Sequence, residues 1–270
     1  MIRKYCCLIM CALLLTGSSH AIIIRHDVSP ASYEVRPSQF PAVFFIERQG
    51  NRKVCAATVI HPQWALTAAH CADETMLAAT IANGRRFAVE VANQTREIDL
   101  LIVHPDYDVN SASDVDLALV RFSLPATIPL PMPLQTDENE LGQVVSLIGW
   151  GYFGLGTTGR QYDDGRFRRA QNRIVRADKR LRVQFDDPRR DATLTLELEG
   201  MPGLGDSGGP ALLETPTGQR LTGIAVGEVV GVDFSEETQG KYGSVAVYER
   251  VSQHIDWIET VIGSSLPFDS

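Results

Sequence analysis

The chain has 270 residues and a formal net charge of −8. Apolar residues make up 44% of it and charged residues 21%, an ordinary globular composition that excludes a disordered or fibrous chain. The excess of acidic residues argues against nucleic acid and anionic membranes as partners.

The N-terminal segment 1–21 is typical of a signal peptide. Arg3 and Lys4 supply a positive start, and the apolar run 6–15 is shorter than the ~20 residues that a membrane-spanning helix needs. Ser19 and Ala21 are the small residues expected before a cut after Ala21. No later segment is apolar enough to cross a bilayer. We therefore expect a secreted or periplasmic protein that is not anchored in a membrane.

The cysteines outside this segment are Cys55 and Cys71. In an exported chain such a pair most simply forms one disulfide. Four histidines lack the spacing of metal ligands: His26, His61, His104 and His254. We expect no metal and no organic cofactor.

Short apolar runs bounded by turn residues recur along the chain. They predict strands at 42–46, 65–69, 100–103, 117–122, 144–148, 221–226 and 245–248. Because no long helical patterns separate them, they favour an all-β sandwich or barrel. The proline-rich stretch 127–133 predicts a linker between two halves. Apolar residues at helical spacing from Val251 to Ile262 predict a C-terminal helix.

The string 205–210 reads Gly-Asp-Ser-Gly-Gly-Pro. Small neighbours allow the hydroxyl of Ser207 to stand on a tight turn, and they let backbone N–H groups approach a developing negative charge. Gly-Ser-Gly alone would indicate only a surface turn. The full string is far more specific and indicates a nucleophile.

At this string the chain resembles the chymotrypsin/trypsin-like serine protease family. Further segments agree in the same order: Thr-Ala-Ala-His-Cys at 67–71, Asp-Leu-Ala-Leu-Val at 116–120, Gly-Trp-Gly at 149–151 and Val-Tyr-Glu-Arg-Val at 247–251. The resemblance implies an all-β fold of two six-stranded antiparallel β-barrels with a C-terminal helix. The peptidase domain would cover 22–270, with barrels near 22–128 and 134–250 and the helix near 251–263.

The resemblance also implies the catalytic roles. Ser207 is the expected nucleophile, His70 the general base and Asp116 the residue that orients this base, while the backbone N–H groups of Gly205 and Ser207 form the oxyanion hole. Asp114 competes for the third place. The apolar run after Asp116 favours Asp116, because a buried orienting residue should begin a strand. The implied activity is that of a monomeric serine endopeptidase acting on protein or peptide substrates.

The chain departs from the family at its activation site. The family's mature chains begin with Ile-Val-Gly-Gly, whose amine pairs with the carboxylate before the catalytic serine, and this string is absent here. A cut after Ala21 would instead expose Ile22, which makes Ile22 and Asp206 the expected activation partners. The alternative, in which residues 22–24 are only a first strand, stays equally open.

The expected specificity pocket also differs from that of trypsin-like members. Met201 replaces the acidic residue at its base, and Ala246 falls where a glycine is common, while Val226 and Gly227 form its wall. Without a charge at the base, a bound Lys or Arg side chain would be desolvated unpaired. We therefore expect an uncharged residue before the scissile bond. Val226 also stands where the family usually has a serine that supports the orienting aspartate.

Two other functions are compatible with parts of the sequence. A serine esterase of the α/β-hydrolase type could use Ser207, Asp233 and His254 in that order, but it needs strand–helix units that are not visible. A catalytically silent binding protein of the same fold would usually lack a triad member, and none is missing. An arginine cluster is expected to be the solvated face of a strand: Arg166, Arg168, Arg169, Arg173 and Arg176.

Overall fold

The computed structural model describes residues 22–50, 52–108, 114–229 and 239–264. The predicted signal peptide and Asp233 lie outside these ranges. Within the described ranges, no helix is long and apolar enough to span a bilayer.

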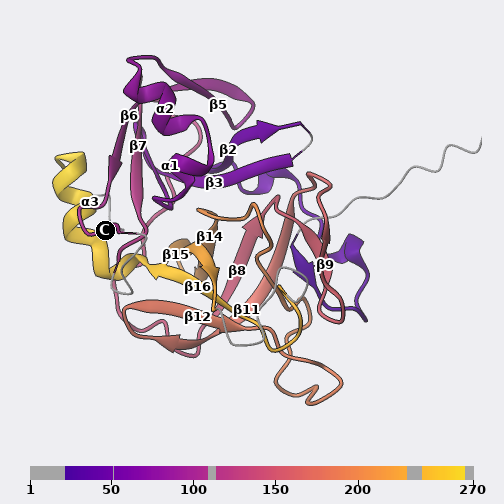
Figure 1. The fold of residues 1–270 in the computed structure, drawn as a ribbon. Helices are drawn as coiled ribbons and strands as arrows, with labels where there is room; N and C mark the ends of the chain where they lie inside the picture. The colour runs from indigo at the N-terminus through magenta and orange to yellow at the C-terminus, as the bar shows by residue number, and fades with distance from the viewer. Residues whose placement is uncertain (1–21, 51, 109–113, 230–238, 265–270) are drawn as a thin grey trace, which may run out of the picture.

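The N-terminal half forms the first six-stranded barrel. Its strands are antiparallel in the order β2-β3-β4-β7-β6-β5, and two short helices lie between β4 and β5 (Figure 1). The elements are β2 (Val43–Gln49), β3 (Arg52–His61), β4 (Trp64–Thr67), α1 (Cys71–Glu74), α2 (Leu77–Ala82), β5 (Phe87–Val91), β6 (Gln94–Val103) and β7 (Ala118–Phe122). The central strand β4 is buried along its whole length, as expected for a strand covered on both faces.

The C-terminal half forms the second barrel, which closes in the order β11-β12-β16-β15-β14-β8. Its strands are β8 (Val144–Gly149), β11 (Arg168–Ala177), β12 (Arg180–Gln184), β14 (Pro210–Thr215), β15 (Gly218–Glu228) and β16 (Val245–Arg250). Along β11 buried and more exposed side chains alternate, because successive residues of a strand point to opposite faces. The prediction of two six-stranded barrels is confirmed.

A third, small group of four strands lies beside the second barrel. It consists of β1 (Ile23–Ile24), β9 (Phe153–Leu155), β10 (Gly159–Tyr162) and β13 (Gly200–Met201). Strand β1 runs parallel to β9 and antiparallel to β13. We expected the first barrel to begin near residue 22, but residues 23–24 pair with these later segments, and the first barrel's strands begin at Val43.

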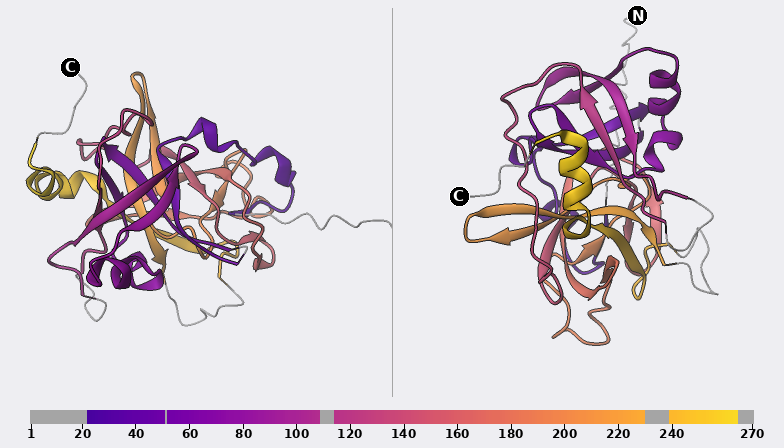
Figure 2. Two further views of the ribbon diagram at one scale, coloured as in Figure 1. Left: turned by 90° about the horizontal axis from the view of Figure 1, so that it is seen from above. Right: turned by 90° about the vertical axis from the view of Figure 1, so that its left-hand side faces the viewer.

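The chain ends on a helix that returns to the first barrel. The 3-10 turn η3 (Val251–His254) leads into α3 (Ile255–Ile262), which Gly263 closes with a left-handed conformation at φ 73°. Val251 and Ile258 are buried in the same apolar core as the first-barrel strands. Figure 2 shows this helix lying along the outside of the two barrels. The predicted C-terminal helix is confirmed. The other 3-10 turns are η1 (Pro30–Ser32) and η2 (Pro37–Gln39).

A disulfide links β3 to the start of α1. Cys55 and Cys71 are bonded, with Cα atoms 5.8 Å apart and a sequence separation of 16. The predicted pairing is confirmed. Because Cys71 directly follows His70, this bond anchors the segment that carries the expected general base.

Candidate active site

His70 lies at the end of the first barrel's central strand, just before α1. Its backbone N–H donates to Asp116 Oδ1 at 2.9 Å, and its ring Nδ1 lies 2.6 Å from Asp116 Oδ2. One carboxylate therefore fixes both the backbone and the ring of the histidine. Since the carboxylate can only accept, Nδ1 carries the proton and Nε2 keeps a free lone pair.

The electrostatic setting of His70 suits a base. Burial lowers the pKa of the imidazole, but the hydrogen bond and charge of Asp116, together with the charge of Glu74, raise it, and the net effect is a raised pKa. The carboxylate stabilises the imidazolium that would form when the ring takes a proton.

Ser207 lies on the turn between β13 and β14, at the junction of the barrels. Its carbonyl oxygen accepts the N–H of Ala56 at 2.7 Å, and the next N–H, that of Gly208, donates to Ala225 at 2.7 Å. Gly208 has φ +75°, and a Cβ there would lie 2.2 Å from the carbonyl oxygen of Ala56. Only glycine allows the serine turn to lie this close to β3. Thr67 Oγ1 also donates to the Ala56 carbonyl at 2.7 Å.

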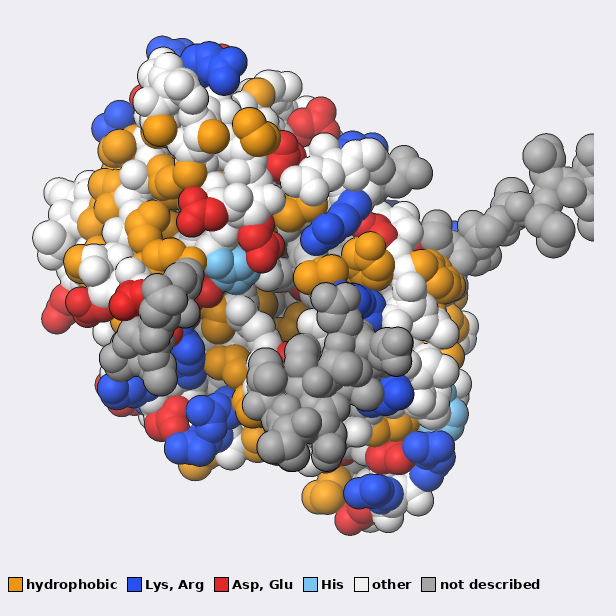
Figure 3. All heavy atoms as spheres, in the orientation of Figure 1, with side chains coloured by type: hydrophobic (Ala, Val, Ile, Leu, Met, Phe, Trp, Pro, Cys, Tyr) orange, Lys and Arg blue, Asp and Glu red, His pale blue; other side chains and the backbone are white. Residues whose placement is uncertain are grey.

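His70 and Ser207 line one open pocket of about 410 Å³. Figure 3 shows a histidine side chain at the edge of a hollow on this face, with acidic side chains nearby. In the described parts of the chain, no hydrogen bond joins the Ser207 hydroxyl to the His70 ring. Such bonds are often long in unliganded enzymes and tighten when substrate binds.

Three of the four expected specificity residues line the same pocket, namely Met201, Val226 and Gly227. Ala246 does not line it; this residue is fully buried in the core of the second barrel. Glu228, which also lines the pocket, accepts the N–H of Gly240 at 3.2 Å, and burial raises the pKa of its carboxyl.

Asp206, which lies between the expected oxyanion-hole residues Gly205 and Ser207 in sequence, is buried. Its Oδ1 accepts the N–H of Gly151 at 2.6 Å and its Oδ2 that of Gly203 at 2.9 Å. A Cβ at Gly149 would lie 1.9 Å from Oδ1, which explains the Gly-Trp-Gly string at 149–151. Burial raises the pKa of Asp206 to about 7, although both N–H groups and the charge of Arg168 act to lower it.

The proposed activation partner, Ile22, is buried in a cluster with Tyr33, Phe153 and Ala170. The hydrogen bonds that the described residues make to the Asp206 carboxylate come from backbone N–H groups of the second half. Ile22 has φ 60°, a left-handed conformation that is strained for a β-branched side chain. Pairing between its amine and Asp206 therefore remains a prediction.

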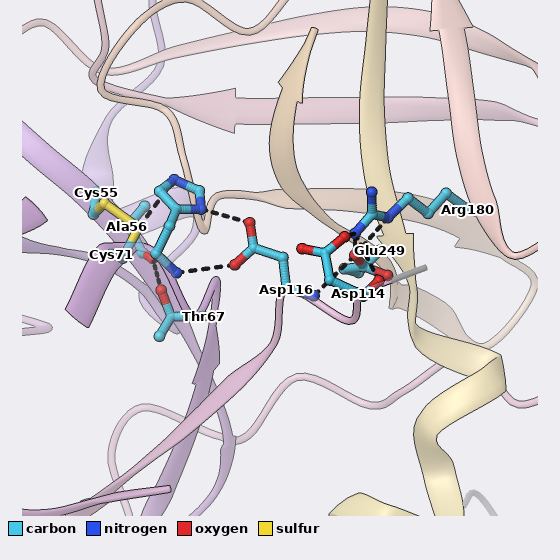
Figure 4. A network of polar contacts seen from close by, with 9 residues as sticks. Cys55, Ala56, Thr67, Cys71, Asp114, Asp116, Arg180 and Glu249 are labelled. Carbon is cyan, nitrogen blue, oxygen red and sulfur yellow. Dashed lines mark hydrogen bonds and ion pairs between the residues drawn. A yellow bond between two sulfur atoms is a disulfide. The ribbon is translucent and has the colours of Figure 1, made fainter. Parts of the chain in front are cut away.

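Sequence reasoning missed a network that supports Asp116. The Asp116 N–H donates to Glu249 Oε1 at 3.0 Å, and Arg180 Nε donates to the same oxygen at 2.6 Å (Figure 4). Asp114, the competitor for the third place, pairs with Arg180 instead. The available signal was Glu249 itself, an acidic residue that directly follows the apolar run 245–248.

The other histidines and the arginine cluster have structural surroundings. His254 packs against His104, and burial lowers the pKa of His254 to about 4. Arg173 and Arg176 are exposed, as expected for a solvated strand face. Arg168 was misjudged, because it is fully buried and paired with Asp164 at 2.9 Å.

The side chains of Cys55, Cys71 and His70 lie close enough to share a metal, but both sulfurs are committed to the disulfide. The all-β architecture also rules out the α/β-hydrolase esterase, whose nucleophile needs a strand–helix elbow. His254, the base that the esterase would use, does not line the pocket of Ser207.

Comparison with known proteins gives consistent matches. The Trypsin family model matches residues 31–258. The chain is 30% identical to serine protease SP24D of Anopheles gambiae over 83% of this chain and 77% of that protein. It is 30% identical to granzyme E of Mus musculus over 67% of this chain and 75% of that protein. It is 29% identical to mouse vitamin K-dependent protein C over 79% of this chain, which spans about half (47%) of that relative.

Proposed function

Because this chain belongs to the trypsin family of serine proteases, we propose that it is an exported endopeptidase that cleaves peptide bonds through an acyl-enzyme on Ser207. The observation that carries the proposal is the double hold of Asp116 on His70, through the backbone N–H at 2.9 Å and the ring Nδ1 at 2.6 Å. This arrangement leaves Nε2 available as the base, and His70 and Ser207 line the same pocket.

In the proposed reaction, the Ser207 hydroxyl attacks the scissile carbonyl carbon while His70 Nε2 takes its proton. The backbone N–H groups of Gly205 and Ser207 stabilise the resulting oxyanion. The imidazolium then protonates the leaving amine, and the C–N bond breaks to leave the acyl-enzyme. Water, deprotonated by the same ring, releases the acid and restores the serine. Asp116 keeps the tautomer and stabilises the imidazolium throughout.

Chemical labelling tests this function directly. A fluorophosphonate should label the wild-type chain, and Ser207→Ala should abolish labelling. Loss of such a serine costs on the order of 10⁶ in turnover. A folded wild-type chain that neither reacts nor cleaves peptides would instead favour the binding-protein alternative, in which the Ser207 hydroxyl and the His70 ring stay apart.

We further propose that the residue before the scissile bond is uncharged. Met201 at the pocket base is buried and offers no counter-charge. The Glu228 carboxylate on the wall is already engaged by the Gly240 N–H. A peptide-library profile dominated by Arg or Lys would overturn this. A profile that Glu228→Gln leaves unchanged would support it.

Export itself would supply the activating amine in this proposal. A cut after Ala21 makes Ile22 the first residue, and an N-terminal residue has no φ constraint, which removes the strain at φ 60°. The new amine could then pair with Asp206. N-terminal sequencing of exported, active protein tests this step, and a start well downstream of Ile22 would contradict it.

A further inference from the structure

We propose that Glu249 and Arg180 of the second barrel are positioning residues that hold Asp116 in place for His70. This inference rests on the proposed function, because it concerns the same triad. Neither residue touches the reacting atoms. Glu249 acts through the backbone N–H of Asp116, and Arg180 acts through Glu249 and through Asp114.

Asp116 makes a contact between the two barrels. Asp116 lies two residues before strand β7 of the first barrel, and its carboxylate is bonded to the His70 ring. Its backbone N–H, however, donates to Glu249 on β16 of the second barrel at 3.0 Å. Glu249 is only 2% exposed, so this is a buried, charge-assisted hydrogen bond. Asp116 is therefore held at two points, one from each barrel.

Arg180 extends this hold along the chain. It lies directly opposite Glu249 in the β12–β16 pairing and donates from Nε to Glu249 Oε1 at 2.6 Å. Its Nη2 donates to the carbonyl oxygen of Asp114 at 3.0 Å and to the Asp114 carboxylate at 3.1 Å. The ion pair of Arg180 with Glu249 therefore hydrogen-bonds to both residue 114 and residue 116, as Figure 4 shows.

The charges explain why both partners are needed. Burial raises the pKa of Glu249, and the nearby charge of Asp116 raises it further, while Arg180 lowers it through a hydrogen bond and its charge. Without Arg180, two carboxylates would share a buried site with no cation between them, which is unfavourable. The net effect is a raised pKa, and Arg180 opposes it by favouring the ionised form of Glu249, which is the stronger acceptor.

Among the residues that the structure describes, the other groups near this network do not supply a cation. His254 Nε2 lies 3.9 Å from Glu249 Oε2, but burial and neighbouring positive groups lower the pKa of His254 to about 4, so it is neutral near pH 7. Burial raises the pKa of the Tyr107 phenol, and the charge of Asp116 raises it further. The charge of Glu74 raises the pKa of His70 itself.

The network fills a gap in the family pattern. The resemblance places Val226 where a serine usually supports the orienting aspartate, and a valine side chain cannot donate or accept a hydrogen bond. In this chain Glu249 supports Asp116 instead, by accepting the backbone N–H of Asp116.

Charge-removing substitutions test the inference. In Arg180→Gln, unpaired negative charge remains beside Asp116. We expect kcat to fall by up to about 10²-fold through misplacement of the base, KM to stay nearly constant, and the acidic limb of kcat/KM to move to higher pH. In Glu249→Gln the amide oxygen still accepts the Asp116 N–H, so kcat should fall less and the limb should move to lower pH. The double substitution should bring the limb back.

A second readout does not depend on turnover. NMR titration of the His70 ring in a Ser207→Ala background should show its pKa raised by Arg180→Gln and lowered by Glu249→Gln. A merely structural role would not produce opposite shifts. Arg176→Gln is the matched control, because Arg176 lies on the same hairpin in an exposed pair with Asp178 and should change neither readout.

The outcomes separate this inference from the proposed function. If wild type is neither labelled nor active, the function fails, and the His70 titration still decides the positioning role. If wild type is active and both variants keep its kcat and its His70 pKa, the positioning role is refuted. Circular dichroism of each variant shows whether it is folded, and Glu249→Gln, which preserves shape, remains informative if Arg180→Gln unfolds.

Discussion

The buried carboxylate of Asp206 makes the pH dependence of stability a test of activation. The perturbation is Asp206→Asn in two forms of the chain: one that starts at Ile22, and one in which residues precede Ile22 so that no amine is available there. Both are made with Ser207→Ala to prevent self-cleavage. The asparagine keeps the shape of the aspartate and removes its titration.

The size of the effect follows from the raised pKa. Burial moves the pKa of Asp206 from 3.8 to about 7 in the absence of a paired amine. The folded state then holds the proton more tightly than the unfolded state. The contribution of this group is fully present below pH 3.8 and is lost as the pH rises through 7. A shift of this size corresponds to roughly 4 kcal/mol.

The assay is equilibrium urea unfolding at several pH values between 4 and 8. In the extended form, the free energy of unfolding of the Asp206 protein should fall relative to its asparagine partner by up to about 4 kcal/mol across this range. In the form that starts at Ile22, an ammonium beside the carboxylate should lower the pKa of Asp206, and the difference should stay nearly flat. A pH-independent offset in the free energy of unfolding between the aspartate and asparagine proteins does not affect the test, because only the change of their difference with pH is used.

Two results would refute the reasoning. A flat difference in the extended form would mean that Asp206 ionises there without penalty. An equal loss in both forms would mean that the amine of Ile22 does not reach Asp206, and that activation by export is wrong.

Three other perturbations have expected outcomes in urea unfolding. Glu140→Gln should cost about 3–5 kcal/mol because it leaves the buried Arg250 without its buried carboxylate partner, which is bonded at 2.6 and 3.1 Å. The matched Glu138→Gln, at an exposed partner 3.4 Å away, should cost less than about 1 kcal/mol. Similar costs for the two variants would contradict this. Replacing both disulfide cysteines by serine should cost about 3 kcal/mol for a loop of 16 residues; unchanged stability would show that the loop is already ordered when unfolded. Gly208→Ala should strongly reduce labelling of Ser207, since the added Cβ would lie 2.2 Å from the Ala56 carbonyl oxygen; normal labelling would mean that the turn can shift.

Local motifs predicted the parts of the site that depend on short segments. The disulfide and the two-barrel fold followed from such strings and are confirmed, and the histidine motif at 67–71 and Asp116 do lie in contact. The reason is that each string combines a strand end with the turn that follows it, so its geometry is largely local.

Contacts between the barrels could not be predicted in this way. The pairing of Glu249 with Arg180 depends on the register of β12 against β16, and their contact with Asp114 and Asp116 depends on how the barrels dock. Arg168 was misjudged for a similar reason. Its position on β11 suited either face, and its burial is tolerable because Asp164 and Glu34 pair with it at 2.9 and 3.6 Å.

The two-sided hold on Asp116 has a consequence for how this protein would lose function. The carboxylate of Asp116 is bonded to His70 of the first barrel, while the N–H of the same residue is bonded to Glu249 of the second. One apolar core joins residues of both barrels, and the second barrel has a further core of its own. A small slip at the junction would therefore move Asp116 out of alignment with His70 while the second barrel stays folded. Under mild denaturant or heat, inactivation should therefore come before the loss of β-sheet signal.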